Sequence, residues 1–109
     1  MGATEDVLTE SQVDAALAAL PDWRYSRGGL VTVYKAPTAD AALELIAAVG
    51  RLAEEQNHHP DLDWRYRRVL LRYSSHDAGD RVTRRDVAAA TAAAAAAARI
   101  GAVAEPPPQ

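Results

Sequence analysis

The sequence predicts an α+β fold: a single domain in the order α-β-β-α-β-β-α, with a four-stranded antiparallel sheet and helices packed on one face. Two observations lead to this prediction. Three helix-forming segments each follow a capping residue, and two pairs of short segments with alternating polarity lie between them. The expected elements are helices over 10–20, 38–57 and 84–100, and strands over 23–26, 30–35, 63–66 and 68–74.

Each expected element has a local cause. Thr9 or Ser11 can cap the first helix, and Pro21 ends it. The first two strands flank Arg27-Gly28-Gly29, which is typical of a hairpin. Thr38 can cap the second helix, which ends near residue 57 because Pro60 disfavours helix at the residue before it.

The second hairpin and the last helix follow from similar patterns. Val69, Leu71 and Tyr73 alternate with Leu70 and Arg72, as in a half-buried strand. In the last helix, Thr83 and Asp86 stand at capping-box spacing, so Asp86 is expected to play a structural role there. Ten of the 14 residues that follow it in this helix are alanine, the strongest helix former.

The composition restricts the possible functions. The 109 residues include 25 alanines, no phenylalanine and only 21 of Val, Leu and Ile, so a monomer is thinly stabilised and a homo-oligomer is expected. No cysteine is present, which excludes disulfides and thiolate chemistry. The net charge of −3 argues against nucleic-acid binding, and no apolar run is long enough for a membrane span. We therefore expect a cytoplasmic, bacterial protein with a loose terminus over 1–8, one domain over 9–104 and an unpacked Pro-rich tail over 105–109.

The three histidines are the candidate catalytic groups. His58 and His59 follow the second helix and His76 follows the last strand, and imidazole can exchange protons near neutral pH. Two other interpretations remain open: these are polar loop residues, or three histidines hold a zinc ion. Glu54 precedes His58 by four residues, so the two side chains can pair if the helix extends to His58. Alternatively, Glu54 is a solvated residue beside Glu55.

A larger pattern contains these residues. It comprises Glu54, then His58-His59-Pro60-Asp61, Tyr66, Ser75-His76-Asp77-Ala78 and Asp86. In this order and spacing, it resembles the pterin-4a-carbinolamine dehydratase family. The preceding Leu-Pro-Asp-Trp segment and the hairpin resemble the same family, so the resemblance covers about residues 9–100.

The resemblance implies a hydro-lyase that converts 4a-hydroxytetrahydropterin to quinonoid dihydropterin and water, in tetrahydrobiopterin recycling. It implies catalytic roles for Glu54, His58, His59 and His76, and substrate contacts from Pro60, Ser75, Asp77 and Ala78. It further implies a homodimer or homotetramer built by extending the sheet across an edge, and no cofactor or metal. A non-catalytic assembly or transcription-coactivator role on the same scaffold, and a metal-dependent lyase, are the alternatives.

Overall fold

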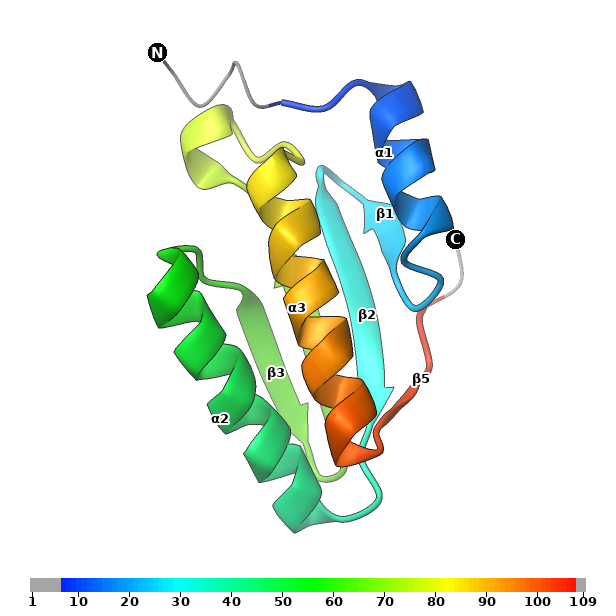
Figure 1. The fold of residues 1–109 in the computed structure, drawn as a ribbon, viewed down its shortest axis with the longest axis vertical. Coiled ribbons are helices and arrows are strands. Elements are labelled where there is room, and N and C mark those ends of the chain that lie inside the picture. The colour runs from blue at the N-terminus through cyan, green and yellow to red at the C-terminus, as the bar shows by residue number, and fades with distance from the viewer. Residues whose placement is uncertain (1–6, 108–109) are drawn as a thin grey trace.

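The computed structural model describes residues 7–107 and contains three long helices on one antiparallel sheet (Figure 1). The elements are α1 (Glu10–Ala18), β1 (Arg24–Ser26), β2 (Gly29–Lys35), α2 (Ala39–Gln56), β3 (Asp61–Arg65), β4 (Arg68–Tyr73), the short 3₁₀ turn η2 (His76–Ala78), α3 (Arg84–Ile100) and β5 (Val103–Ala104). The predicted α+β class and element order are therefore confirmed.

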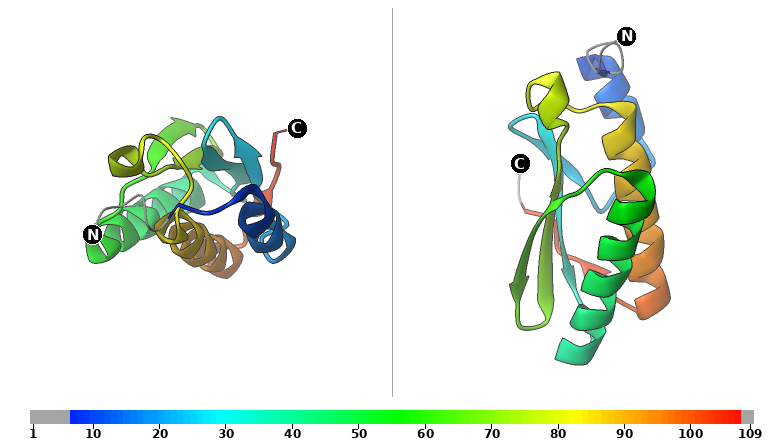
Figure 2. Two further views of the ribbon diagram at one scale, coloured as in Figure 1. Left: turned by 90° about the horizontal axis from the view of Figure 1, so that it is seen from above. Right: turned by 90° about the vertical axis from the view of Figure 1, so that its left-hand side faces the viewer.

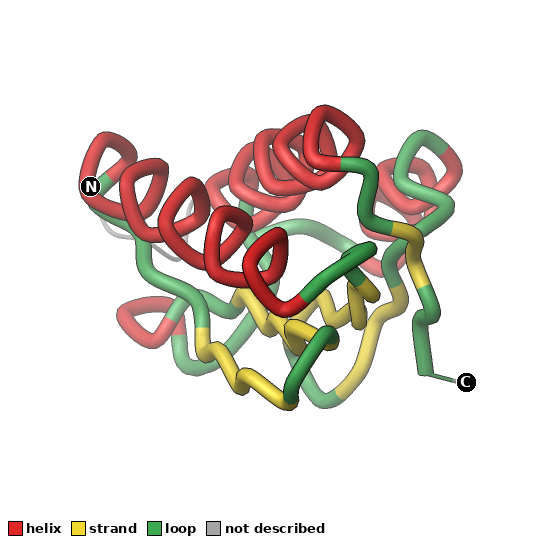
Figure 3. Tube along the Cα trace, turned by 90° about the horizontal axis from the view of Figure 1, so that it is seen from below, coloured by secondary structure: helices red, strands yellow, loops and turns green. Residues whose placement is uncertain are grey.

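The sheet has the strand order β1-β2-β4-β3, and every pairing is antiparallel. All three helices cover one face, as the side view in Figure 2 and the view along the sheet in Figure 3 show. A fifth strand, absent from the prediction, pairs with the end of β2. It forms because Gly101 ends α3 in the left-handed conformation, at φ 85°, and the chain then turns back along Tyr34 and Lys35.

The core lies between the sheet and the pair α2–α3. Alternate residues of β2 and β4 face the helices and are buried, as the sequence pattern predicted. Five alanines of α3 are also buried, and their small side chains leave little bulk between this helix and its neighbours. Trp23 is the largest buried side chain of the core, and its ring packs against Tyr34 and Tyr73 at centroid distances of 6.2 and 5.7 Å.

Several boundaries differ from the prediction. α1 ends at Ala18, and β3 begins at Asp61, two residues earlier than expected. The β3–β4 turn lacks glycine, and Tyr66 adopts the left-handed conformation there, at φ 57°. α2 ends at Gln56 and α3 covers the predicted residues 84–100.

Both ends of the described chain are held more firmly than expected. Val7 bridges Thr83, and the Leu8 amide donates to the Val82 carbonyl at 3.0 Å, so the expected loose segment does not extend to residue 8. The expected unpacked tail is also tethered at its start, because the Glu105 amide donates to Val33 and its carboxylate accepts from Arg68 at 2.9 Å. The remaining residues of both segments, 1–6 and 108–109, lie outside the described residues.

In the described part of the chain, no helix combines the length and the apolar character needed to cross a membrane.

Candidate functional site

The C-terminus of α2 directs two adjacent histidines away from each other. Asn57 adopts the left-handed conformation at φ 51°, and this ends the helix. The His58 amide then donates back to the Ala53 carbonyl at 3.0 Å, which turns the chain inward at His58. His58 is buried, at 8% exposure, whereas His59 lies on the surface.

His58 is paired with the first turn of α3. Its Nε2 lies 2.5 Å from Asp86 Oδ1, and Asp86 is fully buried. The imidazole also stacks on the ring of Tyr73, at 6.1 Å between centroids and 15° between planes. Burial raises the pKa of Tyr73 to about 12, so this wall of the site stays uncharged at neutral pH.

Asp86 is the centre of a buried hydrogen-bond network. Its Oδ2 accepts from the Ser75 hydroxyl at 2.8 Å and from the Thr83 amide at 2.9 Å. The Ser75 proton is used in that bond, so the Thr83 hydroxyl, 2.8 Å away, donates to Ser75. A carboxylate only accepts hydrogen bonds, so His58 Nε2 carries the proton shared with Asp86. In neutral His58, the lone pair is therefore on Nδ1.

His76 lies on the turn that follows β4. The turn closes through Gly79 at φ 74° and Asp80 at φ 56°, and the Ser75 amide donates to the Arg81 carbonyl at 3.1 Å. His76 Nδ1 lies 2.6 Å from Asp80 Oδ1, and both side chains are exposed. In this pair Nε2 is the ring nitrogen that remains for other partners.

The expected pair of Glu54 with His58 is wrong. Glu54 Oε2 instead lies 2.6 Å from Nε2 of His59, with both side chains exposed. The spacing of four residues brings side chains together only within a continuous helix, and Asn57 ends α2 before His58. Glu54 is solvent-exposed, as the alternative interpretation expected, and it also has a histidine partner.

Asp77 is held by α3. Arg85 donates to both of its carboxylate oxygens, at 2.9 and 3.0 Å. These bonds lower the pKa of Asp77 below its usual range. The ion pair therefore stabilises the folded protein at pH values above the ordinary pKa of the carboxyl group. This stabilisation is lost when acidification protonates Asp77.

The remaining expected substrate contacts lie in the same two loops. Pro60 is half-buried beside the histidine pair, whereas Ala78 is buried at the base of the turn. Asp86 joins the two loops, because it contacts both His58 and Ser75, the residue before His76. In Figure 1 the green end of α2 and the yellow-green turn η2 both lie to the left of the start of α3, with the turn above the end of α2.

Three contributors were missed from the sequence. Tyr73 was predicted only as a core residue, and Thr83 only as a helix cap. Asp80 could have been found, because it stands four residues after His76 in a glycine-containing turn. Asp86 does cap the helix as predicted, but its contact with His58 spans 28 residues of sequence and has no local signal.

The part of the chain that the structure describes contains no candidate metal site. Among residues 7–107, no three or more His, Cys, Asp or Glu side chains gather in a way that could hold a metal ion. Each histidine is instead paired with a different carboxylate.

Comparison with known proteins gives a consistent picture. The family model described as pterin 4 alpha carbinolamine dehydratase matches residues 6–100. A relative from Mycobacterium leprae that carries the name pterin-4-alpha-carbinolamine dehydratase is 43% identical over 84 residues, which is 77% of this chain and 88% of the relative. A relative of the same name from Mycolicibacterium smegmatis is 42% identical over 84 residues, which again is 77% of this chain and 88% of the relative.

A solved structure shares the fold. The transcriptional coactivator/pterin dehydratase from Brucella melitensis superposes with a TM-score of 0.80 at 30% identity, and the match covers 84% of this chain and 98% of that one.

Proposed function

This chain belongs to the pterin-4α-carbinolamine dehydratase family and is a hydro-lyase, and we propose that histidine side chains carry out its proton transfers. The proposed reaction breaks the C4a–O bond of 4a-hydroxytetrahydropterin, removes the N5 proton and forms the C4a=N5 bond of quinonoid dihydropterin, releasing water. One group must protonate the leaving hydroxyl and another must accept the N5 proton. No electrons are exchanged, so we propose that no redox cofactor takes part.

The observation that carries this proposal is the buried pair of His58 and Asp86. A histidine held on one ring nitrogen by a carboxylate has a defined tautomer and orientation, which a general acid or base needs. The stacked ring of Tyr73 and the limited exposure of His58 restrict its movement further. The nitrogen that exchanges a proton with the pterin is then Nδ1.

His76 is the proposed second proton-transfer group. Asp80 occupies its Nδ1 and leaves Nε2 for the substrate. We assign His59 to contact with the pterin or to an auxiliary proton transfer, with Glu54 orienting its ring. Pro60 and the backbone of the segment from Ser75 to Ala78 flank these rings, so they are the proposed substrate-contacting loops. The hydroxyl of Ser75 is already bonded to Asp86 and Thr83, so we propose that it supports His58 rather than binding pterin.

The pH dependence of kcat/KM tests the assignment of acid and base to histidines. We expect a bell-shaped profile between about pH 5.5 and 8.5, because one ring must be protonated while the other is neutral. The two limbs belong to the coupled pair rather than to single residues. The measurement is steady-state turnover of the carbinolamine across this range, and a flat profile with chemistry rate-limiting would exclude the histidine assignment.

A second candidate function is that of a binding partner. The Brucella melitensis protein is titled a transcriptional coactivator as well as a pterin dehydratase, and we propose this only as an alternative role of the same scaffold. Turnover separates the two roles, since a partner-only protein needs no intact histidine pair. We propose tetrahydrobiopterin recycling as the physiological process and the cytoplasm as its location.

We propose a homo-oligomer, and two surfaces are candidates for its interface: the apolar face of α2 and the edge of the sheet. In the sequence, large apolar residues lie around more than half of α2, which would predict an exposed apolar face that one sheet cannot cover: Leu43, Leu45, Ile46, Val49 and Leu52. In the structure Leu45 and Val49 are buried, and Ile46 and Leu52 pack against the core. Only Leu43 is largely exposed, at 45%, so α2 gives little reason for association.

The edge strand β3 gives a better reason. Among residues 7–107 no further strand pairs with it, so its outer backbone groups are available to a second copy. Asp61 begins the strand and Arg65 ends it, so antiparallel pairing of two copies brings opposite charges together. Trp64, 48% exposed, would then be covered by the partner.

Trp64→Glu is expected to weaken this dimer, because it places a charge in the shared apolar surface. Light scattering at micromolar concentration should give at least twice the 11.6 kDa chain mass for the unaltered protein and a smaller mass for the variant. Leu43→Glu is the matched control, since it places the same charge on α2. Loss of association in Leu43→Glu alone would move the interface to the helices, and an unaltered protein of monomer mass would rule out the dimer.

A further inference from the structure

The turn that carries His76 has little regular structure to hold it. η2 is only three residues long, and Gly79 and Asp80 both have positive φ. Ser75 and Ala78 fix its base, because both are buried and the Ala78 amide donates to the Ser75 carbonyl at 3.0 Å. The outer arm, with the exposed side chain of His76, is closed by hydrogen bonds within the turn, from the Gly79 amide to the His76 carbonyl at 3.1 Å and between His76 and Asp80. Its position relative to the rest of the domain depends on other contacts.

The first turn of α3 provides such a contact. Arg85 forms two parallel hydrogen bonds with Asp77, the residue after His76. Paired bonds between a guanidinium and a carboxylate fix the relative orientation of both groups, which a lysine would not do. The next residue of the helix is Asp86, which holds His58.

We propose that the first turn of α3 anchors both proton-transfer histidines at once: Asp86 holds His58 directly, and Arg85 holds His76 through Asp77. Two adjacent residues of one rigid helix thus set the separation of the acid and the base. This inference rests on the proposed function, to which it adds Arg85 and Asp77 as positioning residues.

The arrangement also gives Asp77 a different role from direct contact with the pterin. Both of its carboxylate oxygens are already engaged by Arg85. Removing either partner frees the outer arm of the turn and misplaces the His76 ring, and small misplacements of a catalytic group reduce rates strongly. The loss should therefore appear in kcat more than in KM.

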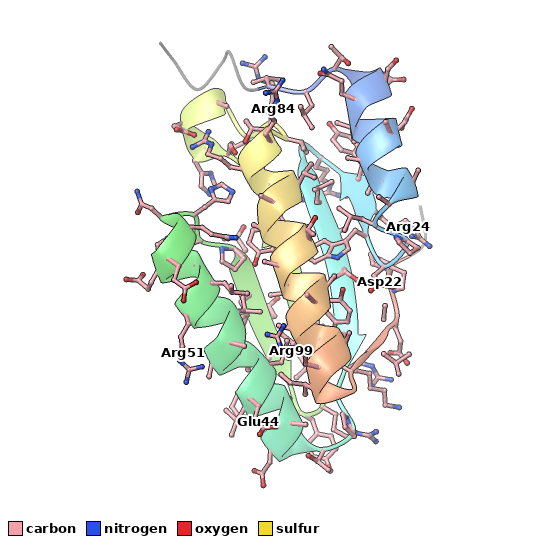
Figure 4. The ribbon with its side chains drawn as sticks, viewed as in Figure 1. Asp22, Arg24, Glu44, Arg51, Arg84 and Arg99 are labelled. Carbon is pink, nitrogen blue, oxygen red and sulfur yellow. The ribbon has the colours of Figure 1, made fainter. Side chains whose placement is uncertain are left out.

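Arg85→Gln and Asp77→Asn test the anchor, with Arg84→Gln as the matched control. Arg84 is the exposed neighbour on the same helix end, labelled in Figure 4. We expect each of the two test variants to lower kcat by about tenfold, and the control to stay within about twofold of the unaltered protein. The double variant should lose no more than either single variant, because both remove the same interaction.

Two kinetic outcomes would overturn the anchor. If Asp77→Asn raises KM while Arg85→Gln has no effect, Asp77 contacts the substrate directly. If the losses multiply in the double variant, Arg85 and Asp77 act independently.

Amide hydrogen exchange without substrate gives a readout that does not depend on turnover. Residues 76–80 should exchange about tenfold faster in both test variants and at an unchanged rate in Arg84→Gln. Unchanged exchange in the test variants overturns the anchor. Faster exchange in a protein whose unaltered form does not turn over the carbinolamine would overturn the proposed function and leave the anchor in place.

Discussion

Replacement of His58 by alanine is expected to lower kcat/KM for the carbinolamine by about 10²- to 10⁴-fold, the usual contribution of a positioned acid or base. The same change at His76 should cause a loss in that range, because the reaction needs both a proton donor and a proton acceptor. Steady-state kinetics of the two variants at the pH optimum of the unaltered protein is the measurement.

His59→Ala serves as the control for these two variants. His59 is an exposed neighbour that is paired with its own carboxylate. Its removal tests whether any histidine in the loop can carry out the proton transfer. We expect a smaller loss than at His58. Equal and near-complete activity in His58→Ala and His76→Ala would contradict the mechanism.

Folding must be measured alongside the kinetics of His58→Ala. Removing the imidazole leaves Asp86 Oδ1 without its partner in the core. An unsatisfied buried acceptor costs about 1–3 kcal/mol. His76 is exposed, so its replacement should leave stability nearly unchanged, and it therefore isolates the chemical effect.

Asp86→Asn is expected to have the second large effect, on activity and stability together. The carboxylate accepts hydrogen bonds on both oxygens, whereas an amide has one oxygen and one NH₂ group. If the NH₂ faces His58, Nε2 must accept and the imidazole proton moves to Nδ1. If the NH₂ faces Ser75 and the Thr83 amide, these two hydrogen-bond donors face another donor and lose their acceptor. Either arrangement disrupts the site.

We expect Asp86→Asn to lower kcat by about 10²-fold through the wrong tautomer or orientation of His58. We also expect the free energy of unfolding to fall by about 1–3 kcal/mol, since buried donors lose an acceptor. Urea unfolding and steady-state kinetics measure the two effects. Unaltered kinetics in a destabilised Asp86→Asn protein would reduce Asp86 to a helix cap.

Asp80→Asn is the matched comparison for stability. Asp80 is also paired with a histidine, but both groups are exposed, and such pairs contribute about 0–1 kcal/mol. A similar loss of stability in the two variants would mean that burial of the Asp86 network does not matter.

Much of the fold follows from the sequence because its causes are local. Thr38 and Thr83 cap their helices, alternation in 68–73 forms β4, and Arg27-Gly28 turns the first hairpin. β5 was not predictable in the same way. This strand has only two residues, too few to show a periodic pattern of polar and apolar side chains. Its pairing depends on where α3 ends relative to β2.

The candidate site also has a part with local causes and a part that depends on contacts between distant segments. The three histidines and the loops that carry them follow from residue types and spacing, and the pairing of His76 with Asp80 is local. The partner of His58 was mispredicted, because local spacing favoured Glu54. A single left-handed residue, Asn57, ended the helix and turned His58 inward.

The sequence by itself therefore determined the α+β class, the element order and the set of histidines available for proton transfer. Only the tertiary structure decided which carboxylate holds which histidine. Asp86 lies 28 residues from His58 and 11 from Ser75, and it meets both because α3 packs on the sheet beside the end of α2. Hydrogen bonds act over about 3 Å in space and have no range in sequence. Such a contact exists only after the layers have packed.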